Sequence, residues 1–112
     1  MNEKEKILVE NFNEYFNLGL EALNKNKFNS ATTLFFKAIV TLCDLYILRK
    51  EGIITSSHSD RFRILEEKYP EIYSIADRDF PFYQDSYTQK MDKETADLLR
   101  EDAKNLKKIL GI

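Results

Sequence analysis

Hydrophobic positions recur at three- and four-residue steps along most of the chain, which is the spacing of one face of an α-helix. The first such stretch covers residues 4–25. A polar run, NKNKFNS, interrupts the pattern, and the most apolar segment, residues 30–51, follows it. Because this segment has apolar residues on two faces, we expect it to be covered on two sides and to form the centre of the fold. We expect Asn29 or Ser30 to cap it by accepting a hydrogen bond from its free amides.

Clear signals mark the end of this central helix and the start of a third. Arg49 and Lys50 lie in its last turn, where cations favour the negative end of the helix dipole, and Gly52 follows. After the short loop IITS, Ser57 with Asp60 resembles a capping box. The pattern therefore predicts a third helix that begins in the stretch SSHSDRF and continues up to Pro70.

The remaining segments complete an all-α fold. Residues 71–87 are less regular, and we expect a helical turn or two around Ile72, ending before Pro81. Asp92 is placed to cap a last helix that runs to about residue 110. No alternating strand pattern is present. The sequence predicts one domain over residues 1–112, an antiparallel, up-and-down bundle of four to five helices.

Composition narrows the classes of function. Hydrophobic residues make up 43% of the 112 residues and charged residues 32%, as in ordinary soluble proteins. With 17 basic and 19 acidic residues the net charge is -2, which gives no broad footprint for a nucleic-acid backbone. We keep RNA open as a partner, although the charge does not support it.

The single cysteine, Cys43, excludes an internal disulfide and a multi-cysteine zinc site. It lies in an apolar run, which favours a packing role. We predict no metal site and no cofactor. The charged N-terminus lacks the apolar core of a signal peptide, and Lys37 and Asp44 interrupt the most apolar stretch. We therefore expect a cytoplasmic protein with no membrane-spanning segment.

The stretch from Tyr15 to Ala38 resembles one tetratricopeptide repeat. Its packing positions hold Tyr15, Leu18, Gly19, Phe28, Ala31, Phe35 and Ala38. A second repeat is expected about 34 residues later, but Ile53 stands where its glycine would fall. A tetratricopeptide-like adaptor that binds peptide tails between the first two helices remains one alternative.

A second resemblance covers most of the chain. An initial helix is followed by FNSATTLFFKAIVTLCDLYILRKEGI, a serine–histidine loop and a last helix in DKETADLLREDAKNLKKIL. This succession resembles the HEPN superfamily of small prokaryotic helical domains. The resemblance implies an antiparallel bundle that pairs as a homodimer. It also implies a partner, since many members accompany a minimal nucleotidyltransferase, often as toxin and antitoxin.

Active HEPN members are metal-independent ribonucleases that use an arginine followed, after four to six residues, by a histidine. Histidine can move the proton of a 2′-hydroxyl, and arginine stabilises charge on the phosphate. Here Arg78 is the best-placed arginine, but Tyr83, Gln84 and Asp85 occupy the histidine positions. The only histidine, His58, precedes Arg61 in the reversed order.

The leading hypothesis is therefore a non-catalytic, HEPN-like dimeric binding module with a nucleotidyltransferase-type partner. The alternative is an unconventional metal-independent ribonuclease, for which the candidate residues are His58, Arg61 and Arg78. We predict that apolar side chains of the central helix and of the segment around residues 80–87 form the dimer interface: Phe36, Val40, Ile47, Phe80, Phe82, Tyr83 and Tyr87.

Overall fold

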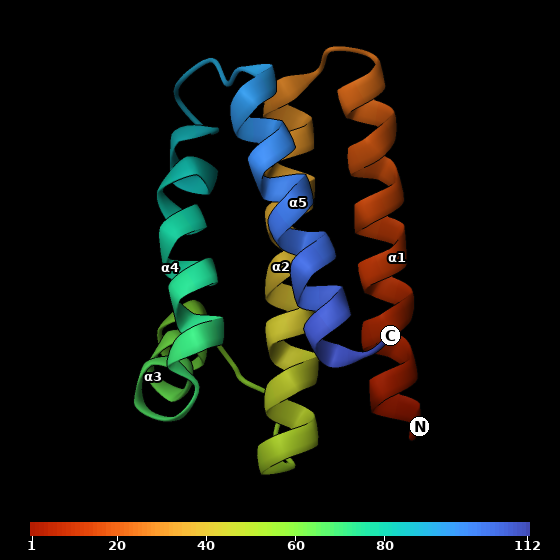
Figure 1. Ribbon diagram of the computed structural model, residues 1–112, viewed down its shortest axis with the longest axis vertical. Helices are drawn as coiled ribbons and strands as arrows, with labels where there is room; N and C mark the ends of the chain where they lie inside the picture. Colours follow the sequence, from red (N-terminus) through yellow and green to blue (C-terminus); the bar gives the residue numbers. More distant parts are fainter.

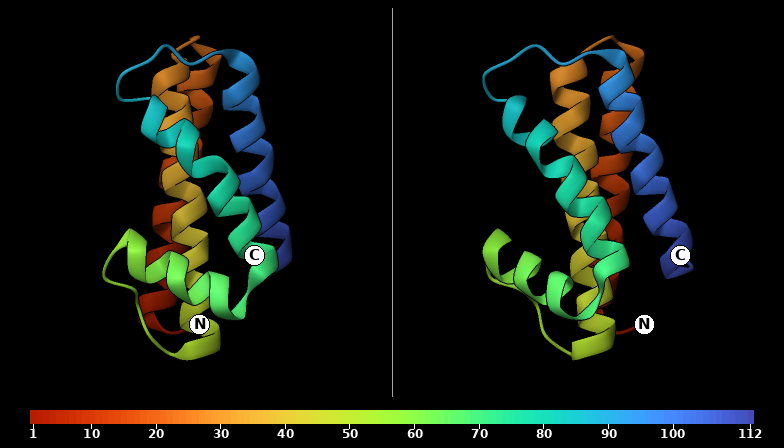
Figure 2. Two further views of the ribbon diagram at one scale, coloured as in Figure 1. Left: turned by 90° about the vertical axis from the view of Figure 1, so that its left-hand side faces the viewer. Right: turned by 60° about the vertical axis from the view of Figure 1, so that its left-hand side comes forward.

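Five helices build the fold in the computed structural model, which describes residues 1–112. They are α1 (Glu3–Asn24), α2 (Phe28–Glu51), α3 (His58–Lys68), α4 (Pro70–Asp85) and α5 (Lys93–Leu110), and no strand is present. The four longer helices alternate in direction, while the short α3 crosses the end of the bundle at which α2 finishes (Figures 1 and 2). The predicted all-α bundle is confirmed.

Helix α2 is the centre of the bundle, as its two apolar faces predict. It packs against α1 on one side and lies between α5 and α4 on the others (Figure 1). Gly19 of α1 allows the close approach of the first two helices, because a side chain there would meet the ring of the fully buried Phe35. Arg49 joins three helix ends, since its side chain pairs with Glu5 of α1 and donates to the Leu110 carbonyl of α5.

By length and composition alone, α2 is apolar enough to cross a membrane, so the expectation that Lys37 and Asp44 exclude this is wrong. Most of its apolar stretch, however, is buried inside the bundle. The core helix of a soluble protein has the same properties, and the fold is consistent with a soluble protein.

The start of α2 differs from the prediction. The helix begins at Phe28, and its N-cap residue, Lys27, makes no side-chain capping bond. Asn29 is therefore not a cap. Its side chain instead donates to the carbonyls of Ser86 and Gln89 at 2.9 and 2.6 Å and accepts from the amide of Met91 at 3.0 Å. Asn29 thus fixes the loop between α4 and α5 to the start of α2.

The predicted starts of the third and last helices are confirmed. The hydroxyl of Ser57 accepts a hydrogen bond from the amide of Asp60 at 3.1 Å, and α3 begins at His58. The carboxylate of Asp92 accepts from the amide of Thr95 at 2.8 Å and caps α5. Gly52 ends α2 in the left-handed conformation, with φ 74°.

The prediction for residues 71–87 is wrong, because α4 is one continuous helix from Pro70 to Asp85. Pro70 suits the first turn, where its missing N–H has no helical partner. Pro81 lies inside the helix and cannot donate to the Asp77 carbonyl. Packing compensates, since Phe80 and Tyr83 on either side of Pro81 place their rings against Phe36 of α2.

Candidate functional site

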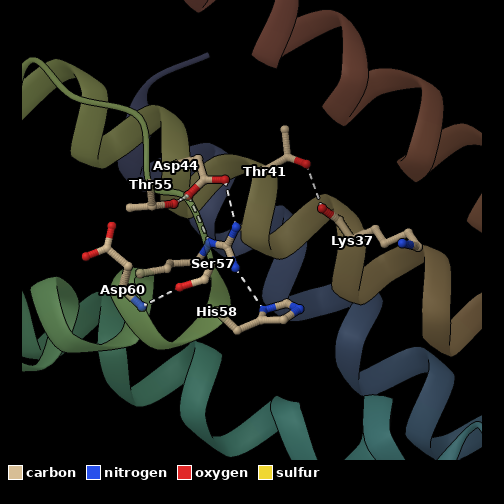
Figure 3. A network of polar contacts seen from close by, with 8 residues as sticks. Lys37, Thr41, Asp44, Thr55, Ser57, His58 and Asp60 are labelled. Carbon is tan, nitrogen blue, oxygen red and sulfur yellow. Dashed lines mark hydrogen bonds and ion pairs between the residues drawn. The ribbon is translucent and has the colours of Figure 1, made fainter.

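The start of α3 brings the only histidine beside an ion pair that links α3 to α2. Ser57 fixes the first turn of α3, and His58 and Arg61, three residues apart, then lie on the same side of the helix. Arg61 binds the carboxylate of Asp44 on α2, and its guanidinium also contacts the ring of His58. Figure 3 shows Asp44, Thr55 and His58 in this network. We refer to Asp44, Thr55, His58 and Arg61 as the α2–α3 polar network.

Arg61 and Asp44 form the centre of this network. The guanidinium donates from Nε to one carboxylate oxygen at 2.8 Å and from Nη2 to the other at 3.0 Å. Such a two-bond pair is the strongest arrangement open to these groups. Thr55 adds a third donor, with its hydroxyl 2.7 Å from the Asp44 carboxylate. Both charged side chains are largely buried, at 11% and 14% exposure, so each neutralises the other in place of water.

The contact between Arg61 and His58 decides which nitrogen of the imidazole carries the proton. Nη1 of Arg61 lies 2.8 Å from Nδ1 of His58. Because a guanidinium only donates, Nδ1 must accept, and the proton of the neutral ring resides on Nε2. The pKa of His58 is lowered, first by partial burial and then by the positive charge of Arg61; Asp44 opposes the shift and Lys37 adds to it.

This arrangement limits the chemistry of His58. A general base needs a free nitrogen lone pair, but Nδ1 is engaged by Arg61 and Nε2 carries the proton. A general acid needs the imidazolium, which the lowered pKa disfavours. In this geometry the neutral His58 offers its surroundings a single N–H donor. The positive charge of Arg61 is likewise used by Asp44 and is not free to face a phosphate.

Aromatic rings from α3 and α4 lie around the imidazole. The ring of His58 is 5.6 Å from that of Phe80, 6.2 Å from that of Tyr83 and 6.3 Å from that of Phe62. Tyr83 in turn stacks on Phe36 at 4.8 Å, which ties the cluster to the core. Its hydroxyl shares a 2.8 Å hydrogen bond with that of Tyr87, and this bond raises the pKa of Tyr83 to about 12.

The third predicted catalytic residue, Arg78, belongs to a different site. It lies on α4, and its guanidinium binds Asp102 of α5 at 2.7 Å. The structure therefore brings His58 and Arg61 together but assigns Arg78 to the contact between α4 and α5. Next to Arg78, Asp79 has no exposed surface, and burial raises its pKa to about 8.

The predicted dimer interface requires a correction. Phe36 and Ile47 have no exposed surface, because α4 and the rest of the core cover them within one protomer. Phe82 lies on another side of α4, in a shallow hollow with Thr95 and Leu98 of α5. The predicted residues therefore do not form one surface. Four of the predicted interface residues keep some exposed surface on the side of α2 and α3. They are the half-buried Val40, Phe80 and Tyr83 and the exposed Tyr87.

Asp44 and Thr55 were missed as members of the site. The usable signal was a single acidic residue inside an otherwise apolar helix, because a charge in the core requires a partner. Asp79 and Asp102 were missed because the first fell in a segment predicted to be irregular, and the second in a helix rich in surface charge.

No group of three or more His, Cys, Asp or Glu side chains is arranged to hold a metal ion. Cys43 is fully buried, and burial raises its pKa to about 12, which confirms its packing role.

Comparisons of the chain with protein-family models, with curated proteins and with solved structures gave no match.

Proposed function

We propose that this chain is a non-catalytic, HEPN-like helical bundle that works as a homodimer and binds a nucleotidyltransferase-type partner. The family and the partner in this proposal rest on the sequence resemblance, as do the toxin–antitoxin-like context and the cytoplasmic location. The antiparallel helical architecture agrees in class with what that resemblance implies. The direct check on the partner is whether a neighbouring gene encodes a minimal nucleotidyltransferase whose product co-purifies with this chain.

The main support for a non-catalytic protein is that the candidate catalytic groups are already bonded within the chain. Nδ1 accepts from Arg61, Arg61 is bound through two bonds to Asp44, and Arg78 is bound to Asp102. Each group that a ribonuclease would need is thus engaged by another part of the same chain. Their bonds join α3 to α2 and α4 to α5, so these groups stabilise the fold, which is consistent with a protein that binds but does not catalyse.

Metal-free RNA cleavage separates this proposal from the ribonuclease alternative. We expect purified protein in the presence of a chelator to leave single-stranded RNA intact. His58→Ala is expected to behave like the parent, because the imidazole has no free lone pair to act as a base. Cleavage by the parent that disappears in His58→Ala would establish the enzyme instead.

The dimer is expected to use the exposed side of Tyr87 and Val40. Tyr87 is 72% exposed although aromatic, and aromatic side chains are enriched in protein interfaces. In sedimentation experiments the parent should have twice the chain mass of 13.2 kDa, and the double variant Val40→Glu/Tyr87→Glu the mass of one chain. Leu18→Glu is the matched control, since Leu18 is also an exposed apolar residue but lies on α1. A monomeric parent refutes the dimer, and a dimeric double variant refutes this surface.

The adaptor alternative has less support. Helix α5 covers one side of the α1–α2 hairpin, where the Lys107 ammonium lies 6.0 Å from the centre of the Phe12 ring. Arg49 also donates to the carbonyl of Leu110, which fixes the end of α5 to the hairpin. A peptide could enter on that side only by displacing α5.

A further inference from the structure

Two acidic side chains meet inside the contact between α4 and α5. Asp79 of α4 has no exposed surface, and Asp102 of α5 is 4% exposed. The guanidinium of Arg78 lies beside both carboxylates, with Nη2 2.7 Å from Asp102 and Nε 3.6 Å from Oδ1 of Asp79. The second distance is too long for a hydrogen bond, so neither oxygen of Asp79 accepts one, and the same is true of Oδ2 of Asp102. Two ionised carboxylates cannot be stable neighbours in this setting, because each would be both desolvated and repelled by the other.

A single proton bound by the pair removes the repulsion between the two carboxylates. A protonated Asp79 can donate to the carboxylate of Asp102, and Arg78 binds that carboxylate from the solvent side at 2.7 Å. The pair then carries one negative charge, which the half-exposed guanidinium of Arg78 balances. Burial is the main cause that raises the pKa of Asp79 to about 8, and the neighbouring Asp102 adds to it.

Asp102 and Arg78 are the charged groups that change the pKa of Asp79. Asp102 acts on Asp79 from α5, and Arg78 acts on it from α4 itself. Helix α2, the third element at this contact, packs against α4 through Phe36 and adds no charge that acts on Asp79. Loss of the proton to solvent therefore leaves one uncompensated negative charge in the core.

Helix α4 is the element best suited to respond to that charge. Pro81, two residues after Asp79, already removes one backbone hydrogen bond from the helix. Helix α5 has no such interruption, and it packs along α2 more extensively than α4 does. A segment with fewer stabilising contacts opens at a lower free energy than the rest of the protein.

We propose that the contact between α4 and α5 is a proton-dependent latch, in which α4 stays docked only while the Asp79–Asp102 pair holds one proton. At acidic and neutral pH the pair is singly protonated and α4 covers the core. As the pH rises the proton leaves to solvent, and the docked state loses stability relative to one in which α4 has opened. The latch does not rest on the proposed function, because neither the partner nor the dimer enters the argument for it.

The sign of the effect follows from proton linkage. An exposed aspartate titrates near pH 4, whereas Asp79 in the docked state holds its proton up to a pH of about 8. Between these values the docked state binds more protons than the opened state. The opening equilibrium is therefore expected to rise close to tenfold for each pH unit in this window and to level off above it.

Cys43 provides a native reporter of the opening. It is the only cysteine and it is fully buried. It lies seven residues after Phe36, about two helical turns, and thus on the same face of α2 as Phe36, which α4 covers. The rate of labelling by a disulfide reagent such as dithiobis-nitrobenzoate, divided by that of a small thiol at the same pH, measures how often the site opens. We expect this ratio to rise about fiftyfold from pH 6 to pH 8 in the parent, because the increase is half levelled off at a pH equal to the pKa of Asp79.

Asp79→Asn is the decisive variant, because it keeps the size and the donor of the protonated side chain but cannot titrate. Its labelling ratio should be independent of pH over the same range. His58 is present in both proteins, so any contribution it makes cancels in the comparison. A flat ratio in the parent, or an equal slope in Asp79→Asn, overturns the proposal.

Two further measurements keep the result unambiguous. Asp102→Asn removes the like charge and supplies a donor to Asp79, so it should reduce the slope above pH 6 even if Asp79→Asn does not fold. Low concentrations of urea should leave the labelling ratio of the parent at pH 8 nearly unchanged, since local opening exposes little surface. A strong dependence on urea would mean that the whole protein unfolds, and the latch would be wrong.

Discussion

Asp44→Ala is expected to lower the free energy of unfolding by about 3 kcal/mol at neutral pH. The substitution leaves Arg61 largely buried with no carboxylate, and it removes the acceptor of the Thr55 hydroxyl. The loss reflects an uncompensated buried charge rather than the net value of the ion pair. Urea unfolding followed by circular dichroism measures the change directly.

Glu67→Ala is the matched control for this experiment. It also removes one carboxylate from an arginine, but Arg63 and Glu67 are both more than half exposed. Exposed pairs contribute little, so we expect a change below about 0.5 kcal/mol. Arg61→Lys should lie between the two, because it keeps the charge but loses the two-bond geometry. A loss below about 1 kcal/mol in Asp44→Ala would mean that the α2–α3 polar network does not stabilise the fold.

Gly19→Ala is expected to destabilise the protein by about 2 kcal/mol, although alanine is the better helix former. A Cβ atom at this position would lie 2.6 and 2.7 Å from two ring carbons of Phe35. That ring has no exposed surface and therefore no free space into which it can move. Helices α1 and α2 would have to separate, which disturbs the most extensive helix–helix contact of the fold.

The neighbouring Leu18 offers the control for this prediction. Its side chain is exposed on the same helix, so Leu18→Ala should change the stability by less than about 0.5 kcal/mol. Phe35→Leu makes room beside residue 19, and the double variant Gly19→Ala/Phe35→Leu should lose less stability than the sum of the single variants. If Gly19→Ala instead stabilises the protein, helix propensity outweighs packing at this contact.

The contrast between α5 and α4 explains which elements could be predicted from the sequence. In α5 the local signals agree, since Asp92 caps the helix as expected and the helix ends at Leu110, where the sequence predicts its end. In α4 the local signals conflict, because Pro81 predicts a break while the apolar positions continue past it. The conflict is decided by the rings of Phe80 and Tyr83, which pack on a helix more than 40 residues earlier in the chain. No local signal contains that contact.

The candidate site could also be predicted only in part. The capping motif placed His58 at the start of a helix, and the three-residue spacing placed Arg61 beside it. The sequence did not reveal that Asp44 would bind Arg61, because this pairing depends on how α3 crosses α2. The same dependence misled the prediction for Phe36, whose apolar character suits an interface as well as a core. Whether α4 covers it is a property of the folded chain.

The sequence by itself determined the class of the fold, the order of the helices and most of their ends. These properties follow from the periodicity of apolar residues and from capping groups, which act over one or two helical turns. The tertiary structure alone decided the tautomer of His58, the engagement of Arg61 and Arg78, and the burial of the Asp79–Asp102 pair. These properties depend on the distances between helices, because desolvation and ion pairing are set by whatever side chains the fold brings within a few ångströms.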